Sequence, residues 1–290
     1  MIQDIAPHQY NNAYKPVPPK KDSFALYYEK KTCMMKKSEE GMTFPTFADL
    51  ERLNEDIYEN YTYLFSIDDK PFYLVNDINR ERLSAYTMEN TEVFRTIQPR
   101  DLAFAGITGY QLYSWYQSHK FCGRCGSPTQ KDEKERMLYC EKCGSMEFPK
   151  ICPATIIAVR DGNRLLLSKY AGRTYKKYAL LAGYTEIGET IEETVKREVM
   201  EEVGLKVKNI QYYKSQPWSF SDTLLMGFYC DLDGEDKITL DQDELALAEW
   251  FEREDLPEVT SDESLTNEMI QMFKPVSYTH LRAHETSAHL

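Results

Sequence analysis

The 290-residue sequence has no long apolar run and no excess of positive charge. No window approaches the roughly 18 consecutive apolar residues that a membrane-spanning helix needs. A net charge of −12 leaves no diffuse basic field that could hold nucleic acid non-specifically. The opening MIQDIAPHQYNNAYKPVPPKKD has no apolar signal-peptide segment. We therefore expect a soluble cytoplasmic protein without membrane contacts, and 42% hydrophobic content is typical of a folded chain.

Histidine is scarce, and three of the 5 histidines lie in the final run KPVSYTHLRAHETSAHL. This run abandons the helical pattern that precedes it, and VSYTHLRAHET back-translates into a common sequencing adapter. We expect residues 276–290 to be non-native read-through. A disordered tail and a histidine metal site are the alternatives, and the run is left out of the functional argument.

The chain has 7 cysteines, an odd number that would leave one unpaired in a set of disulfides. Four of them form a C-x2-C-x14-C-x2-C array in FCGRCG and YCEKCG: Cys122, Cys125, Cys140 and Cys143. This spacing is typical of a zinc ribbon, in which four sulfurs close the coordination shell of a structural zinc ion. Disulfides are the alternative. A ribbon can also bind nucleic acid, but the intervening QKDEKERML is mixed in charge. The remaining cysteines, Cys33, Cys152 and Cys230, are expected to be small buried side chains.

The patterns along the chain predict two larger folded regions around the ribbon. Residues 1–120 form an expected β-rich N-terminal domain with a hairpin in YTYLFSIDDKPFYLV, a helix in FADLERLNEDIYENY capped by Thr46, and a second helix in RDLAFAGITGYQLYSWYQSHK. Residues 121–148 form the zinc ribbon. Residues 149–275 contain strand patterns in ATIIAVR, LLLSKY, KVKNIQYYKSQ, TLLMGFYCDL and ALAEWFERED, with a closing helix in DESLTNEMIQMF. Strands flanked by helices predict a layered α/β domain there.

One segment, GYTEIGETIEETVKREVMEEVGL at residues 183–205, combines many glutamates with a single arginine. Apolar residues recur by fours along one helix face, whereas Glu198, Glu201 and Glu202 lie three and four apart on another, so we expect their carboxylates to converge. Such a cluster needs positive charge, and Mg²⁺ or Mn²⁺ take oxygen ligands of this kind. Gly204 suits a helix C-cap and Gly183 a tight loop before the helix. A solvated acidic helix face is the alternative, but it would not require the arginine or the glycines.

This segment matches G-x5-E-x7-R-E-U-x-E-E-x-G-U, with U aliphatic, and so resembles the Nudix box. The resemblance implies an α/β/α sandwich Nudix fold in an α+β chain. It also implies metal-dependent hydrolysis of a nucleoside diphosphate linked to another group. By resemblance, Glu198 and Glu202 bind the catalytic cations and Glu201 binds metal or polarises the attacking water. Glu189 pairs with Arg197. The carbonyl of Ala182 and the carboxylate of Glu244 are further implied metal ligands.

Ten residues after the box, SQPWSFSDTLLMGF is similar to the SQPWPFPxSLMxxF signature of NADH pyrophosphatases. The four-cysteine ribbon and the box occur in that branch in the same order. The resemblance implies a set of substrate-binding residues: Glu135, Phe148, Tyr184, Gln216, Pro217, Trp218, Ser219, Phe220, Ser221, Asp222, Thr223 and Thr266. The chain departs from the pattern where Phe148-Pro149-Lys150 replaces YPR and where Ser219 and Ser221 replace prolines. These departures concern substrate preference more than hydrolysis.

The resemblance therefore implies hydrolysis of NADH or NAD⁺ to nicotinamide mononucleotide and AMP, and removal of NAD caps from RNA by the same chemistry. Its cofactors are one structural Zn²⁺ and catalytic Mg²⁺ or Mn²⁺, and its family members form homodimers. Two alternatives remain. One is a Nudix hydrolase of ADP-ribose or another nucleotide sugar, and the other is a zinc-ribbon binding module with an inactive Nudix domain.

Overall fold

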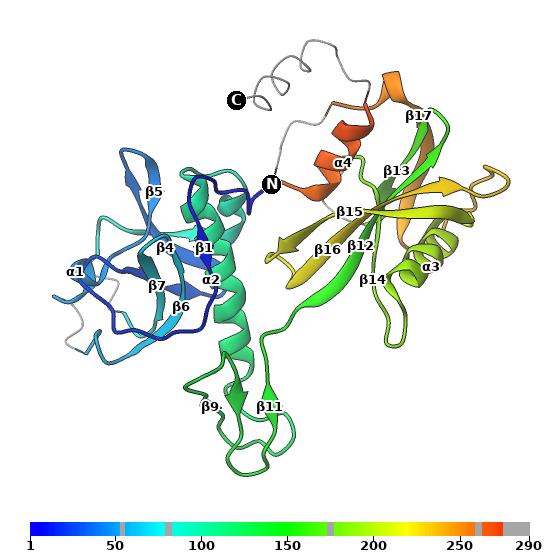
Figure 1. Cartoon of the computed structure of the whole chain (residues 1–290). Coiled ribbons are helices and arrows are strands. Elements are labelled where there is room, and N and C mark those ends of the chain that lie inside the picture. Colours follow the sequence, from blue (N-terminus) through cyan, green and yellow to red (C-terminus); the bar gives the residue numbers. More distant parts are fainter. Residues whose placement is uncertain (53–55, 79–82, 173–176, 259–262, 275–290) are drawn as a thin grey trace, which may run out of the picture. The chain divides into compact units, whose positions relative to one another are not determined.

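The computed structural model describes residues 1–52, 56–78, 83–172, 177–258 and 263–274 (Figure 1). The suspected read-through at 276–290 lies outside these residues. The chain divides into two compact units. One contains Cys152–Pro217 and the chain from Thr223 onward, together with Met1; the other contains Ile2–Ile151 and Trp218–Asp222. In the described part of the chain, no helix is both long and apolar enough to cross a bilayer.

The N-terminal unit is built from short strands around an aromatic-rich core. The predicted hairpin is confirmed, since β6 (Tyr61–Ile67) pairs antiparallel with β7 (Lys70–Val75). They belong to a sheet of order β1-β6-β7-β2, and a second sheet contains β3, β4, β5 and β8. The remaining strands are β1 (Tyr10–Asn11), β2 (Phe24–Leu26), β3 (Tyr28–Glu29), β4 (Thr32–Ser38), β5 (Gly41–Thr43) and β8 (Thr87–Asn90).

The two helices predicted in this unit differ in outcome. Helix α2 (Arg100–Ser118) is confirmed and buries its apolar face in the core. Thr46 does cap α1 through a reciprocal capping box with Asp49, but α1 (Phe47–Leu50) ends after one turn and the described residues beyond it form turns. The longer helix was a wrong prediction, because apolar spacing alone does not supply the packing that sustains an isolated helix. A 3₁₀ segment, η2 (Thr91–Arg95), precedes α2.

The cysteine segment forms a small antiparallel sheet in the order β11-β10-β9. Its strands are β9 (Gln130–Lys131), β10 (Leu138–Tyr139) and β11 (Met146–Glu147). Helix α2 leads directly into it, and the chain then continues into the second unit (Figure 1). Three strands this short bury little apolar surface, so the segment needs a cross-link such as a metal to be stable.

The second unit is organised by a mixed six-stranded sheet in the order β15-β16-β12-β13-β17, with β14 also paired to β12. β12 runs parallel to β16 and antiparallel to β13 and β14. These strands confirm the predicted ones and add β14: β12 (Cys152–Asp161), β13 (Arg164–Tyr170), β14 (Leu181–Tyr184), β15 (Val207–Trp218), β16 (Thr223–Leu232) and β17 (Leu245–Glu252). A 3₁₀ turn, η3 (Arg253–Asp255), follows.

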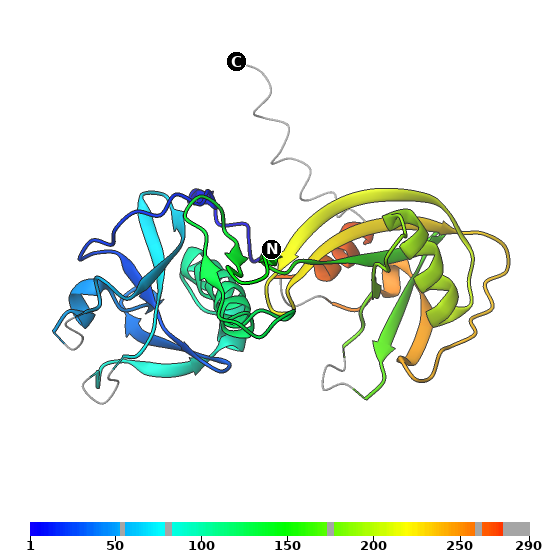
Figure 2. The ribbon, with the colours of Figure 1, turned by 90° about the horizontal axis from the view of Figure 1, so that it is seen from below.

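Helices α3 (Ile191–Val203) and α4 (Leu265–Phe273) cover opposite faces of this sheet (Figures 1 and 2). Ile157 and Val159 of β12 pack with α3, whereas the alternate residues Ile156 and Ala158 pack with α4. Because successive side chains of a strand point to opposite faces, this alternation defines two apolar layers on one sheet. The predicted α/β/α sandwich is confirmed.

Candidate functional site

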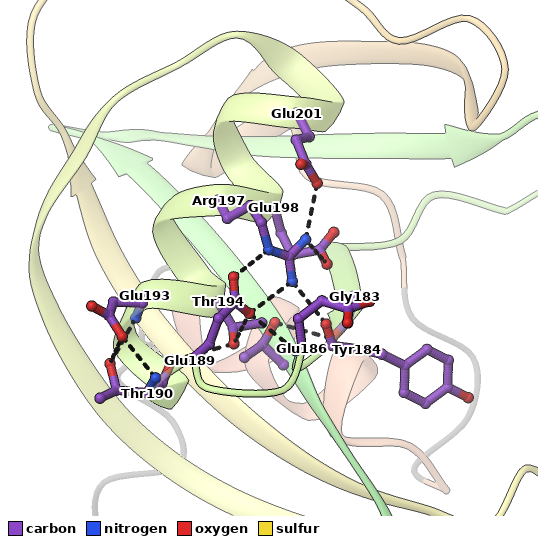
Figure 3. A network of polar contacts seen from close by, with 11 residues as sticks. Gly183, Tyr184, Glu186, Glu189, Thr190, Glu193, Thr194, Arg197, Glu198 and Glu201 are labelled. Atoms are coloured by element: carbon purple, nitrogen blue, oxygen red, sulfur yellow. Dashed lines mark hydrogen bonds and ion pairs between the residues drawn. The ribbon is translucent and has the colours of Figure 1, made fainter.

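Arg197 is the centre of the polar network on α3 (Figure 3). Its Nε donates to Oε1 of Glu189 at 2.5 Å and its Nη2 to Oε2 of the same carboxylate at 3.0 Å. Its Nη1 donates to Glu198 Oε1 at 2.8 Å and to Glu201 Oε2 at 2.9 Å. The Nη2 also donates to the carbonyl oxygen of Tyr184 at 2.9 Å. The one arginine of the segment thus joins three carboxylates to the end of β14, which explains why the segment requires it.

Glu189 is held in the loop before α3 by more than the arginine. It accepts hydrogen bonds from the Thr194 hydroxyl at 2.9 Å and from the backbone N–H of Glu186 at 3.1 Å. The hydrogen bonds from Arg197, followed by those of the loop, lower the pKa of Glu189 to about 2. A carboxylate with this many donors stays ionised and fixes the loop against the helix. The predicted pairing of Glu189 with Arg197 is present in the structure.

The ends of α3 position the glutamates. Thr190 caps the N-terminus in a reciprocal capping box with Glu193, whose carboxylate accepts from the Thr190 backbone N–H at 2.8 Å. Gly204 ends the helix at φ 70° in the left-handed region, as predicted for a C-cap. The T-x-x-E pattern at 190–193 was a signal for this cap that the sequence argument did not use.

Gly183 has a different role from the predicted one. It lies within β14, paired with Thr155, and not in a tight loop. A Cβ at this position would lie 1.8 Å from Cδ of Glu198 and 2.0 Å from its Oε1. The backbone of β14 is therefore packed against the Glu198 carboxylate, and only glycine leaves the space that this carboxylate occupies.

The three glutamates predicted to bind metal differ in exposure. Glu198 is 8% exposed and Glu202 is 1% exposed, whereas the Glu201 side chain is 59% exposed. Burial raises the pKa of Glu198 and the neighbouring Arg197 opposes this shift, while Glu201 and Glu244 add repulsion. Glu244 thus lies close enough to act on the Glu198 carboxylate.

The donor set around Glu198 fits a hard divalent cation. Of the three glutamates predicted to converge, Glu198 and Glu201 share the Nη1 of Arg197, but among the described residues no three acidic side chains lie within 4.8 Å of one another. Ala182, whose carbonyl is a further predicted ligand, precedes the glycine that packs against Glu198. Oxygen-only ligands select Mg²⁺ or Mn²⁺ over softer metals. Arg197 lies between Glu198 and Glu201, so part of the negative charge is already balanced.

The four predicted cysteines form the tightest cluster of metal-ligand side chains. Their sulfurs all lie within 4.8 Å of one another, and within the described residues no other group of three or more such side chains is this close. The Cys122–Cys143 and Cys125–Cys140 sulfur pairs are each 3.5 Å apart. Zn–S bonds of about 2.3 Å in a tetrahedron place sulfurs about 3.8 Å apart, so the geometry fits one zinc ion.

The backbone of the cysteine knuckles favours thiolates. Hydrogen bonds from Ser127 lower the pKa of Cys125 to about 6. At Cys143 a backbone hydrogen bond from Ser145 also lowers the pKa, but desolvation and the three neighbouring thiols outweigh it and raise the pKa to about 12. Four thiolates at this spacing repel one another, and a bound cation removes that repulsion.

Two residues predicted to contact substrate are placed near the network. Tyr184 is 52% exposed, and its ring points away from the carboxylates (Figure 3). Its hydroxyl lies 3.3 Å from that of Thr223. An exposed aromatic face close to the acidic cluster suits stacking on a base.

Residues of the SQPWSF segment make contacts with other parts of the protein. Gln216 is fully buried; its Nε2 donates to the carbonyl oxygen of Glu263 at 2.8 Å and its Oε1 accepts from the N–H of Leu265 at 2.7 Å, where α4 begins. The rings of Trp218 and Phe220 pack under the guanidinium of Arg95, at 4.8 and 4.0 Å from the ring centroids. Arg95 was not identified from the sequence, because nothing in its local pattern indicates a contact so far along the chain.

The other residues predicted to contact substrate differ in how far they are exposed, and their roles stay predictions. Ser219 and Thr223 are buried, Asp222 is half-buried at φ 56°, and Phe148, Glu135, Pro217 and Ser221 are exposed. Thr266 lies in the first turn of α4.

Comparison with known families adds to this geometry. The NUDIX domain model matches residues 150–273. Those residues are a Nudix domain. A second model, the NADH pyrophosphatase zinc ribbon domain, matches residues 117–148. The Nudix domain of this chain is therefore preceded by a zinc ribbon of the NADH pyrophosphatase type, as the sequence resemblance implied.

Curated relatives match about half of this chain. The "NAD-capped RNA hydrolase NudC" of Klebsiella pneumoniae is 43% identical over 150 residues, which cover 51% of this chain and 58% of the relative. The protein of the same name from Haemophilus influenzae is 39% identical over 167 residues, covering 56% of this chain and 62% of the relative. The chain thus matches less than two thirds of either relative. A solved NUDIX hydrolase from Nitrosomonas europaea is 24% identical, with a TM-score of 0.42, covering 48% of this chain and 80% of that one.

Proposed function

We propose that the protein is a metal-dependent NAD(H) diphosphatase that cleaves the diphosphate of NADH or NAD⁺ into nicotinamide mononucleotide and AMP. The observation that carries the proposal is the Arg197 network, which presents Glu198 and Glu201 together beside β14. The zinc ribbon of the NADH pyrophosphatase type supports the choice of substrate. The relatives named as NAD-capped RNA hydrolases support a second substrate, the NAD cap at the 5′ end of RNA.

The residues of this chain have distinct tasks in that reaction. Glu198, Glu202, Glu244 and the Ala182 carbonyl would hold Mg²⁺ or Mn²⁺. When bound, such ions lower the pKa of coordinated water and offset the charge of the diphosphate. Glu201 would accept a proton from the attacking water, and the exposure of its side chain supports this role. The water oxygen bonds to one phosphorus, the bridging P–O bond breaks, and each product leaves as a monophosphate.

Arg197 and Glu189 do not touch the substrate in this scheme. Arg197 fixes the side chains of Glu198 and Glu201 through the two hydrogen bonds of its Nη1, and Glu189 fixes Arg197 in turn. Pre-set carboxylates avoid reorganisation during the reaction, which is the main way in which such a site lowers its barrier.

The direct test is product analysis by chromatography after incubation with NADH and Mg²⁺ or Mn²⁺. Nicotinamide mononucleotide and AMP in equal amounts are expected, and an absence of both from folded, zinc-loaded protein would refute the proposal. The panel also contains ADP-ribose, another nucleotide sugar and an NAD-capped RNA. A strong preference for ADP-ribose would favour the nucleotide-sugar alternative, and hydrolysis of none of them the inactive binding module.

The homodimer and the cytoplasmic location implied by the family resemblance stay predictions. Light scattering of the purified protein measures the first, and cell fractionation the second.

A further inference from the structure

A small cavity of about 200 Å³ lies where the zinc ribbon, the C-terminal end of α2 and the β6–β7 hairpin meet, all within the N-terminal unit. Its lining is polar and basic rather than acidic, and its described members are Thr62, Leu74, Asn76, Tyr116, Gln117, Lys120, Thr129, Lys131 and Leu138. None of these is a carboxylate. Lys120 and Lys131 both belong to this lining, in a chain whose net charge is −12.

Lys131 is held in this cavity by the fold. Its backbone belongs to β9, opposite Leu138, and its ammonium group donates a hydrogen bond to the Thr62 hydroxyl. The same ammonium group lies 5.5 Å from the centroid of the Tyr116 ring. Lys131 as a whole residue is exposed, and its ammonium group is the part that contacts Thr62 and Tyr116.

The charge of Lys131 is not offset nearby. Partial burial of the ammonium group lowers the pKa of Lys131. Among the described residues no ion pair to Lys131 is present, whereas lysines such as Lys21 and Lys208 are paired with carboxylates at 2.9 Å. A partly buried ammonium group without a carboxylate partner is stabilised when an anion binds to it.

Hydroxyl and amide groups complete a site of the kind that binds oxyanions. The Thr62 hydroxyl accepts from Lys131 and keeps its own proton to donate to an anion. Thr129 supplies no donor, since its N–H donates to the Lys120 carbonyl at 3.1 Å and its hydroxyl to the His119 carbonyl at 2.6 Å. Asn76 and Gln117 supply amide N–H donors. Drug-sized ligands occupy about 300–1,000 Å³, so a cavity of 200 Å³ suits a single tetrahedral anion.

We propose that this cavity binds one phosphate group, with Lys131 and Lys120 as its cationic ligands. The phosphate could be free inorganic phosphate or one backbone phosphate of an RNA chain, because both present the same oxygens. The site is separate from the residues of the Nudix box, and the proposal does not depend on hydrolysis.

The experiment measures binding in the full-length, zinc-loaded protein. Sodium phosphate is titrated at constant ionic strength while the backbone amide NMR signals of Lys120, Thr129 and Lys131 are followed. In a second arm, an uncapped 5′-hydroxyl RNA decamer, which has no diphosphate to cleave, is titrated by fluorescence anisotropy. Lys131→Met removes the charge, Lys131→Arg keeps it, and Lys134→Met removes a charge from the same ribbon outside the cavity.

We expect phosphate to cause saturable shifts of these NMR signals. Lys131→Met should bind phosphate about tenfold or more weakly, which is the factor for losing a charge-assisted hydrogen bond. Lys131→Arg and Lys134→Met should bind phosphate nearly as well as the wild type. Lys120→Met is the second variant if Lys131→Met does not fold. Phosphate binding without RNA binding identifies a small-anion site, and lysine-dependent binding of both identifies an RNA backbone site. The proposal would be overturned if the protein bound neither phosphate nor RNA, or if Lys131→Met and Lys120→Met both left binding unchanged.

Discussion

The two predicted metal sites of this chain balance their charges in different ways. In the ribbon, the sulfurs of four cysteines face one another, with two sulfur pairs at 3.5 Å. On α3, by contrast, Arg197 already joins Glu189, Glu198 and Glu201. A metal site is closed and structural when protein side chains fill every coordination position of the ion. A catalytic metal site keeps coordination positions open for water and substrate. The comparison indicates that metal removal should unfold the first region but only inactivate the second.

The largest expected effect is the loss of zinc and of folded structure in the ribbon. Cys140→Ser removes one thiolate from a buried position, and we expect loss of the zinc ion together with the fold of residues 122–143. Structural zinc contributes apparent free energies of about 10–16 kcal/mol at pH 7, far more than these short strands can supply. Metal analysis and amide NMR check the outcome. Cys152→Ser, at an isolated cysteine, is the control, and a folded ribbon without zinc would contradict the structural role.

The next effect is on catalysis without loss of fold. Glu201→Gln keeps the size of a mostly exposed side chain but removes its charge, and we expect kcat to fall by about a hundredfold or more, as for loss of a general base. Zinc content and the unfolding temperature should be unchanged. Steady-state kinetics with NADH measure the change, and Glu192→Gln, an exposed glutamate outside the network, is the matched control. Undiminished turnover would remove Glu201 from the mechanism.

A smaller effect is expected at Gly183. In Gly183→Ala the new methyl group would overlap the Glu198 carboxylate, which is the end of a flexible side chain and can move aside. We expect the protein to fold while kcat falls by roughly tenfold or more, because a misplaced ligand loses its alignment. Gly123→Ala, where no atom lies within 4 Å of the added Cβ, should be silent. Equal activity in the two variants would show that the close packing of β14 on Glu198 is unimportant.

The smallest effect is the dependence of stability on pH at Glu189. Its pKa is about 2 in the folded protein against an ordinary value of 4.5, so its contribution is fully present above about pH 4.5 and is lost as the pH falls toward 2. The stability difference between wild type and Glu189→Gln should therefore shrink over this interval. Denaturant unfolding at several pH values measures it. High salt should reduce the difference, because the pair is partly exposed. A difference independent of pH would exclude the ion pair as its source.

The sequence predicted those features that a local pattern encodes. The thiol spacing indicated the ribbon, the apolar periodicity indicated α2 and α3, and the fixed positions of the box indicated Glu189 as one partner of Arg197. It failed where distant segments meet. Gly183 was assigned to a loop because its contact with Glu198 depends on how β14 packs against α3. The hydrogen bonds of the Gln216 side chain to the start of α4 were not foreseen either, and its contact with substrate stays a prediction. Arg95 could not be found, because more than a hundred residues separate it from Trp218.

The position of β12 at the centre of its sheet determines how the second unit unfolds. It is hydrogen-bonded to β16 on one edge and to β13 and β14 on the other, and its apolar side chains enter both cores. Solvent can reach its amides only if the sheet separates, so their exchange with deuterium should report global unfolding rather than local fraying. Because β14 connects the Arg197 network to that strand, this unit should lose the network and its fold in a single cooperative step.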